Sequence, residues 1–357
     1  MTGAGAGGRA DGTAEWYRRF AELEARGRSA VYEDWGRGVA GDERMLARIR
    51  SLPEQRRQPN LVFACSRLLG APEGGYPAWR DWTLAHWDAV AAEALRRRTQ
   101  TNEPGRCAVL LPALAAIPGP IALLELGTAA GLCLYPDRYA YRYDGGPVLG
   151  RSSVLLDCAT TAGAEGSAPR RPPGIAGWPG IAGLPEIVWR AGIDLHPLDV
   201  RDGDAMRWLE TLVWPEEHDR RERIRAAAGI VRAEGAAGRP PLLVAGDLVD
   251  CLDDVAALAP AEATLVIMHT AVMPYVVRAE RERLFARIRA LAAERGARWI
   301  AAEGTPAFTW LFPRAARSST RFALVVDGAL RGFAGAHGEY LELLPDAQLP
   351  GAQPAGA

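Results

Sequence analysis

The sequence predicts an α/β protein in which a mainly parallel sheet follows a helical N-terminal region. Apolar residues recur at helical spacing between Ala14 and Arg97, and no convincing strand precedes about residue 120. From Ile121 onward, short apolar runs alternate with helical patterns, which is typical of a parallel sheet covered by helices. The length of 357 residues is enough for about two domains.

Composition and charge argue against several classes of partner. Lys and Arg total 42 against 43 Asp and Glu, so the formal net charge of -1 gives no electrostatic reason to expect nucleic acid or an anionic membrane. The longest apolar run, Cys107 to Gly127, is broken by prolines, and Met1 to Gly12 lacks the pattern of a secretory signal. We therefore expect a cytoplasmic protein that binds neither nucleic acid nor a membrane. The oligomeric state stays open.

The five cysteines favour buried thiols over disulfides or a zinc site. Their number is odd, they are widely scattered, and no pair has C-x-x-C spacing. The five histidines are also far apart in the sequence. We therefore expect no metal centre.

Changes in composition divide the chain into four parts. Residues 1–13 and 345–357 are rich in Gly, Ala or Pro and are expected to be disordered tails. Residues 14–118 form the helical N-terminal region, and residues 119–344 form the α/β domain. An irregular insertion at about residues 145–185 is rich in Gly, Ala, Pro and Ser, although residues 153–158 could form a short strand.

Six apolar segments are the expected strands of one mainly parallel sheet. They are residues 121–126, 188–194, 242–246, 264–269, 298–302 and 322–326, and helical patterns at 205–213, 220–232 and 278–293 lie between several of them. Parallel strands end at the same edge of a sheet, and open α/β sheets bind ligands at that carboxyl edge. Polar residues that follow these strands are therefore the candidate functional residues.

The most informative motif runs from Glu125 to Gly131 (ELGTAAG), between the first strand and a helical run. Gly127 and Gly131 allow a tight turn and close approach of the backbone to a ligand, with Thr128 between them. The Glu125 carboxylate could accept a hydrogen bond from a ligand ammonium group. The G-x-x-x-G spacing is neither the G-x-G-x-x-G of nicotinamide or flavin sites nor a phosphate loop. The turn could also serve only to pack a helix on a sheet.

Two aspartates end later strands. Asp194 lies in the sequence GIDLHP and could hold both hydroxyls of a ribose, because one carboxylate can accept two hydrogen bonds from a vicinal diol. Asp247 lies in AGDLVD and could accept a hydrogen bond from an adenine amino group. Asp194 could alternatively hold the local turn, and Asp247 could be an ordinary helix N-cap.

His269 ends the fourth strand and is the candidate catalytic base, because imidazole titrates near neutral pH. The alternative is a hydrogen-bonded histidine of the core. Substrate-side candidates are Tyr275 and the polar segment between Arg98 and Arg106, which offers Gln100, Asn102 and Glu103. That segment could instead be a helix end and a turn.

These segments together resemble a known family, and the chain is identified as a member of the bacterial domain-of-unknown-function family 2332. The resemblance runs from about Trp16 to Leu344, and it is carried by the sequences RQPN, RRTQTNEPGR, ELG, WP, GIDLHP and HT. The ends of four strands also occur in the order of class I S-adenosylmethionine-dependent methyltransferases. The resemblance implies a Rossmann-like methyltransferase sheet joined to a helical N-terminal part.

From this resemblance we expect transfer of a methyl group from S-adenosylmethionine to a small molecule. Glu125, Gly127, Thr128, Gly131, Asp194 and Asp247 would bind the cofactor, as the resemblance implies. The alternative is a non-methylating enzyme, or a ligand-binding or scaffold protein on a degenerate fold. One departure favours the alternative: the family pattern has Asn two residues after the second glycine, where this chain has Cys133.

Overall fold

A computed structural model describes residues 12–100, 102–162, 183–312 and 321–344. The chain divides into two compact units. We call residues 1–101 with 203–222 the helical unit, and residues 102–202 with 223–357 the α/β unit. The expected tails lie outside the described residues except for Gly12 and Thr13, and so do residues 163–182 of the expected insertion.

The helical unit is built around aromatic side chains. Its helices are α1 (Thr13–Arg19), the π-helical η1 (Phe20–Ala25), α2 (Ala30–Gly41), α3 (Glu43–Arg50), η2 (Glu54–Arg56), α4 (Pro59–Leu68), α5 (Tyr76–Ala85), α6 (Trp87–Arg96) and α8 (Gly203–Thr211). Trp35 stacks on Trp79 with 4.9 Å between ring centroids. Trp208 and Trp214, which are distant in sequence, join the same buried cluster. Aromatic burial of this extent dominates the energetics of a small core.

The α/β unit contains one mixed sheet of eleven strands. The strands are β1 (Ile121–Leu126), β2 (Ala140–Tyr143), β3 (Val148–Leu149), β4 (Leu155–Ala162), β5 (Ile187–Asp194), β6 (Leu242–Ala245), β7 (Thr264–Thr270), β8 (Arg298–Gly304), β9 (Arg321–Val326), β10 (Ala329–Gly335) and β11 (Tyr340–Leu343). Their order is β3-β2-β4-β11-β10-β9-β8-β7-β1-β5-β6. Strands β8, β9, β10 and β11 pair antiparallel in succession, as do β2 and β3.

Five neighbouring strands, β6-β5-β1-β7-β8, are all parallel. The chain starts at β1 in the middle, moves outward through β5 and β6, and then returns to the other side of β1 at β7. The strand order therefore reverses between β1 and β7, and this reversal makes a topological switch point. In open α/β sheets, ligands bind outside the carboxyl ends of the strands at such a point.

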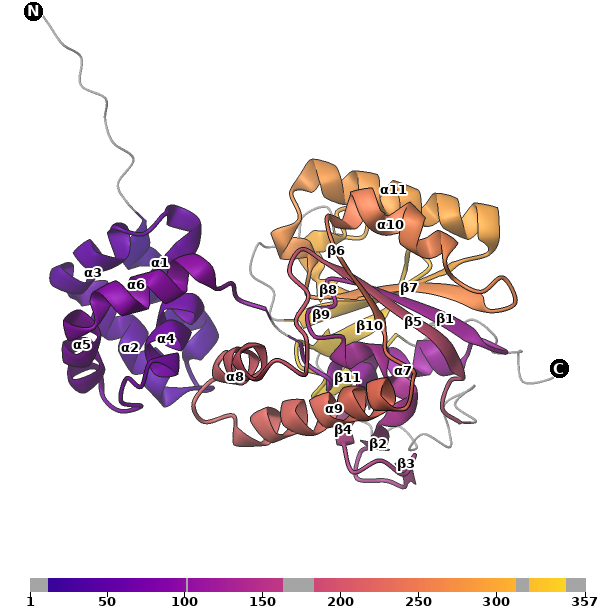
Figure 1. Ribbon diagram of the computed structural model, residues 1–357, viewed down its shortest axis with the longest axis horizontal. Coiled ribbons are helices and arrows are strands. Elements are labelled where there is room, and N and C mark those ends of the chain that lie inside the picture. The colour runs from indigo at the N-terminus through magenta and orange to yellow at the C-terminus, as the bar shows by residue number, and fades with distance from the viewer. Residues whose placement is uncertain (1–11, 101, 163–182, 313–320, 345–357) are drawn as a thin grey trace, which may run out of the picture. The chain divides into compact units, whose positions relative to one another are not determined.

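The parallel strands have two distinct faces. Helices α10 (Leu248–Ala257) and α11 (Arg278–Arg295) cover one face, and α7 (Arg106–Ala115) packs against the other (Figure 1). Leu124 of β1 and Ile267 of β7 point toward α10 and α11, because they share one buried cluster with Leu252 and Leu284. Side chains alternate along a strand, so Glu125 points to the α7 face.

The six expected strands are confirmed within one or two residues at their ends. The sheet is mixed, although parallel pairs are the majority, and β2, β3, β10 and β11 were not expected. Residues 155–162 form β4, extending the short strand considered for 153–158. The helical run expected after Gly131 is only a 3₁₀ turn, η3 (Leu132–Leu134). Among the described residues, no helix is both long enough and apolar enough to cross a membrane.

Candidate functional site

The glycine-containing turn after β1 is held tightly by the protein itself. Gly127 and Gly131 adopt φ values of +77° and +71°, which glycine tolerates without steric cost. A Cβ at Gly127 would lie 2.4 Å from Cγ2 of Val272. The Gly127 and Gly131 N–H groups donate to backbone carbonyl oxygens at 2.8 and 2.7 Å. With only a 3₁₀ turn following, this loop lacks the helix N-terminus that we expected to face a ligand.

Glu125 is a buried carboxyl group, with 1% of its surface exposed. Burial raises the pKa of Glu125 to about 8, against opposing effects of the Thr128 hydroxyl and the Arg106 charge. The Thr128 hydroxyl donates to Oε2 of Glu125 at 2.8 Å. Glu125 is therefore largely protonated at neutral pH, and it does not present the exposed carboxylate that we expected to meet an ammonium group.

Asp194 lies beside this turn on the same face of the sheet. Its Oδ2 accepts from the Ala129 N–H at 2.9 Å, and its Oδ1 accepts from the His196 N–H at 2.8 Å. Thr128 can pack on β5 because residue 192 is glycine; a Cβ there would lie 2.5 Å from the Thr128 side chain. These contacts fix the Asp194 carboxylate at the carboxyl end of β5, where its side chain is partly exposed.

Asp247 occupies the neighbouring strand end. The Gly246 N–H donates to the Asp194 carbonyl oxygen at 2.9 Å, which joins the ends of β5 and β6. Asp247 is the N-cap of α10, and its Oδ1 accepts from the Val249 N–H at 2.8 Å. The capping alternative is thus what the structure shows, and the exposed Asp247 carboxylate lies one strand away from Asp194.

The polar segment before α7 lies under the same turn. Oδ1 of Asn102 accepts from the Leu132 N–H at 2.8 Å, and both residues are buried. Glu103 is fully buried and forms an ion pair with Arg223 at 2.9 Å. Arg106 donates to the Ala336 carbonyl oxygen at 2.9 Å. Asn102 and Glu103 therefore support the turn from within, and neither is exposed to a substrate.

Cys133 takes part in this buried layer. Its thiol donates to the Glu103 carbonyl oxygen at 3.3 Å. The thiol of Cys107 points to the Cys133 carbonyl oxygen at 3.7 Å. Contact with Cys107 and burial raise the pKa of Cys133 well above its ordinary value, so it remains a neutral thiol. The departure from the family pattern thus falls in the packing beneath the turn.

His269 lies on the opposite face of the sheet from Glu125, and it is fully buried. The Trp299 indole N–H donates to its Nε2 at 3.0 Å; the indole is only a donor, so Nδ1 carries the proton and donates to Glu303 at 2.9 Å. Both ring nitrogens are occupied, which corrects the expectation of a catalytic base. His269 has its alternative role, a hydrogen-bonded histidine of the core.

The remaining candidate residues are Tyr275 and Gln100. Tyr275 is 63% exposed on the short helix η6 (Met273–Tyr275), and Gln100 belongs to the helical unit. Sequence reasoning missed Glu303, a fully buried carboxylate that also accepts from the Val272 N–H at 3.0 Å. The sequence contains a signal that Glu303 is unusual, because it is a charged residue within the apolar run of a buried strand. Across the described segments, no group of three His, Cys, Asp or Glu side chains could hold a metal ion.

Comparison with known proteins identifies a family. A family model described as "Uncharacterized protein conserved in bacteria (DUF2332)" matches residues 14–342. No curated protein and no solved structure matches the chain.

Proposed function

The chain belongs to this DUF2332 family, and we propose that it binds S-adenosylmethionine at the carboxyl edge of β1, β5 and β6 and transfers the methyl group to a small molecule. The strand order supports the proposal, because β6-β5-β1-β7-β8 follows the doubly wound order with its switch point beside β1. The observation that carries the proposal is Asp194, a partly exposed carboxylate held in place at this edge by two backbone N–H groups.

The hydrogen-bond acceptors that the site offers fit the nucleoside end of the cofactor better than its amino-acid end. A carboxylate at the end of β5 is the kind of group that a ribose diol would need, because one carboxylate can accept hydrogen bonds from both hydroxyls. Asp247, one strand further along, would accept from the adenine amino group. Glu125 fits an ammonium group poorly, because it is buried and largely neutral.

The bound cofactor would supply an electrophilic methyl group, so the protein has mainly to align the acceptor with it. His269 is unable to remove a proton from the acceptor, because both of its ring nitrogens are engaged. An acceptor that attacks before it loses a proton, such as a neutral amine, fits this site best. The amine would form its bond to carbon as the carbon–sulfur bond breaks, and the resulting ammonium would release its proton to water.

The second candidate function is ligand binding without methyl transfer on a degenerate fold. It is favoured by the turn after β1, whose N–H groups at Gly127, Ala129 and Gly131 all donate within the protein. Because these N–H groups already have acceptors within the protein, the turn can be a purely structural element of the sheet that needs no ligand. The two candidates share the nucleoside contacts and differ in catalysis.

Calorimetry with S-adenosylhomocysteine tests ligand binding, which the two candidate functions share. We expect the full chain to bind, and Asp194→Ala to weaken affinity by about 1–3 kcal/mol through the loss of ribose hydrogen bonds. The matched control is Asp157→Ala, which removes an exposed carboxylate that pairs with Arg142 on the same sheet. Wild-type chain that fails to bind at millimolar ligand would refute the proposal. Binding without methyl transfer to any of a panel of amines would favour the second candidate.

A further inference from the structure

Two adjoining hollows lie along α11, on the face of the sheet opposite to Glu125. The first, which we call the α11 groove, lies between α11 and the segment Pro306–Trp310 and has a volume of about 260 Å³. The second lies where α11 meets the start of β8 and has a volume of about 350 Å³. Arg289 lines both hollows. Their sizes are near those of small-molecule sites.

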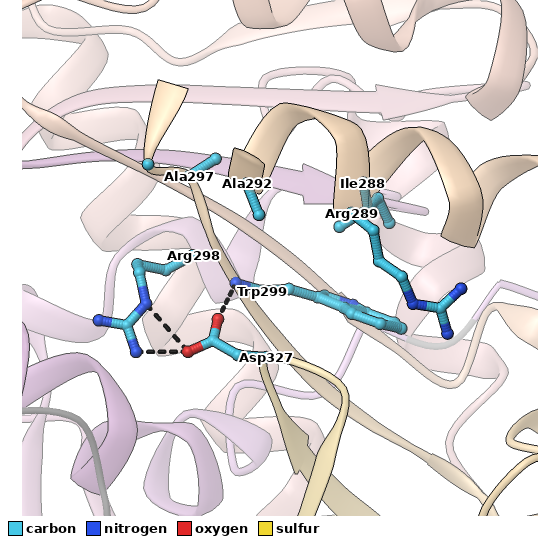
Figure 2. A pocket seen from close by; sticks show the side chains of 8 residues that line it. Ile288, Arg289, Ala292, Ala297, Arg298, Trp299 and Asp327 are labelled. Carbon is cyan, nitrogen blue, oxygen red and sulfur yellow. Dashed lines mark hydrogen bonds and ion pairs between the residues drawn. The ribbon is translucent and has the colours of Figure 1, made fainter. Parts of the chain in front are cut away.

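Arg289 is held in place by aromatic rings. Its guanidinium lies 4.9 Å from the centroid of Trp310 and 5.7 Å from that of Trp299. Within the described parts of the chain, the Arg289 side chain forms no ion pair and no hydrogen bond. Figure 2 shows its guanidinium on the far side of Trp299 from Asp327, which pairs with Arg298 instead. Stacking leaves the N–H edges of an arginine available for a planar anion.

The α11 groove has an excess of positive charge. Residues 281, 285 and 289 recur every fourth position and so lie on one side of the helix, which places Phe285 between Arg281 and Arg289. Among the described residues that line the groove, the acidic one is Glu282, which is paired with Arg278 at 3.0 Å. Among the described residues, the buried Nε of Arg281 has no hydrogen-bond partner, while Nη2 of Arg281 donates to the neutral Val276 carbonyl oxygen at 2.9 Å. The groove therefore offers uncompensated cationic groups beside apolar surface.

We propose that the α11 groove binds a small aromatic anion. Its carboxylate or phosphate group would contact Arg289 from the solvent side, and its ring would pack along Phe285 and the 39% exposed Trp310. Guanidinium groups hold carboxylate and phosphate oxygens through paired N–H donors, so either head group satisfies the same chemistry. This site is separate from the proposed cofactor edge, because it lies on the other face of the sheet.

Calorimetry on the full chain at low ionic strength tests the proposal. The probes are benzoate, phenyl phosphate, inorganic phosphate and the neutral benzamide. We expect benzoate or phenyl phosphate to bind about tenfold or more tightly than benzamide and inorganic phosphate, because both the charge and the ring contribute. The tighter of the two aromatic anions identifies the preferred head group.

Substitutions on α11 locate the binding. Arg289→Met keeps the aliphatic stem and should weaken binding about tenfold or more, whereas Arg289→Lys should weaken it less. The matched control is Arg283→Met, an exposed arginine of the same helix that pairs with Glu280 and lines neither hollow. The proposal is overturned if no aromatic anion binds at millimolar concentration. It is also overturned if Arg289→Met binds like the wild type, or if Arg283→Met loses as much affinity.

Discussion

Replacing Glu125 with Gln should change how the stability of the protein depends on pH. The carboxyl group has a pKa of about 8 in the folded chain, against 4.5 as its ordinary value. Between these two values the folded state keeps the proton and the unfolded state does not. The free energy of unfolding therefore falls as pH rises through this window, by about 1.4 kcal/mol for each pH unit.

The window of 3.5 units, from 4.5 to 8, corresponds to about 5 kcal/mol. Glutamine keeps the shape of the side chain and an oxygen that can accept from the Thr128 hydroxyl, and it carries no titrating proton. The Glu125→Gln chain should match the wild type near pH 4.5 and exceed it in stability by several kcal/mol above about pH 8.

Urea denaturation followed by circular dichroism at a series of pH values measures this difference. The control is Glu282→Gln, since that exposed carboxylate pairs with its helix neighbour Arg278. Its curve should run parallel to the wild type within about 0.5 kcal/mol. If the Glu125→Gln and wild-type curves also ran parallel from pH 4.5 to 8, the raised pKa of Glu125 would be refuted.

Two further predictions concern the supports of the turn and of β8. Gly127→Ala should cost about 2 kcal/mol or more, because it adds contacts of 2.4 and 2.6 Å with Cγ2 and Cβ of Val272 to the strain of a φ of +77°. Gly131→Ala should cost about 1 kcal/mol. Adding Val272→Gly, which removes both contacting atoms, should offset part of the cost of the first variant only, as thermal melts would show. Glu303→Ala should cost about 3–5 kcal/mol by leaving the His269 ring and two backbone N–H groups without acceptors. Glu303→Gln should cost less in urea denaturation, and equal stabilities for the two variants would contradict the network.

The sequence was sufficient to locate β1, β7 and β8 because each is a short apolar run with both faces buried, as in Leu123 and Leu124 of β1. It was not sufficient for β10, where Arg331 and Gly332 interrupt the apolar pattern and the pairing with β9 shifts its register. The position of such an antiparallel strand is determined by pairing with the neighbouring strand, and not by a periodic pattern in its own sequence.

The candidate site was predicted in part. A motif shows which residues follow a strand, and this placed Thr128 and Asp194 at one edge correctly. It does not show which face of the sheet a side chain points to, since a shift of one residue reverses the face. His269 and Glu125 both lie at or near a strand end, and they lie on opposite faces of the sheet. The motifs alone do not distinguish these two faces. The partnership of Glu103 with Arg223 spans 120 positions and leaves no local pattern.

The helical unit takes part of its core from the middle of the chain, and this has a consequence for the order of synthesis. Trp208 and Trp214 belong to the same buried cluster as Phe20 and Trp35, although β1 and β5 are made in between. When residue 101 has been synthesised, the core of the helices made so far therefore still lacks the indole rings of Trp208 and Trp214. The first part of the protein to be synthesised completes its core only after residues 102–202 of the α/β unit have left the exit tunnel.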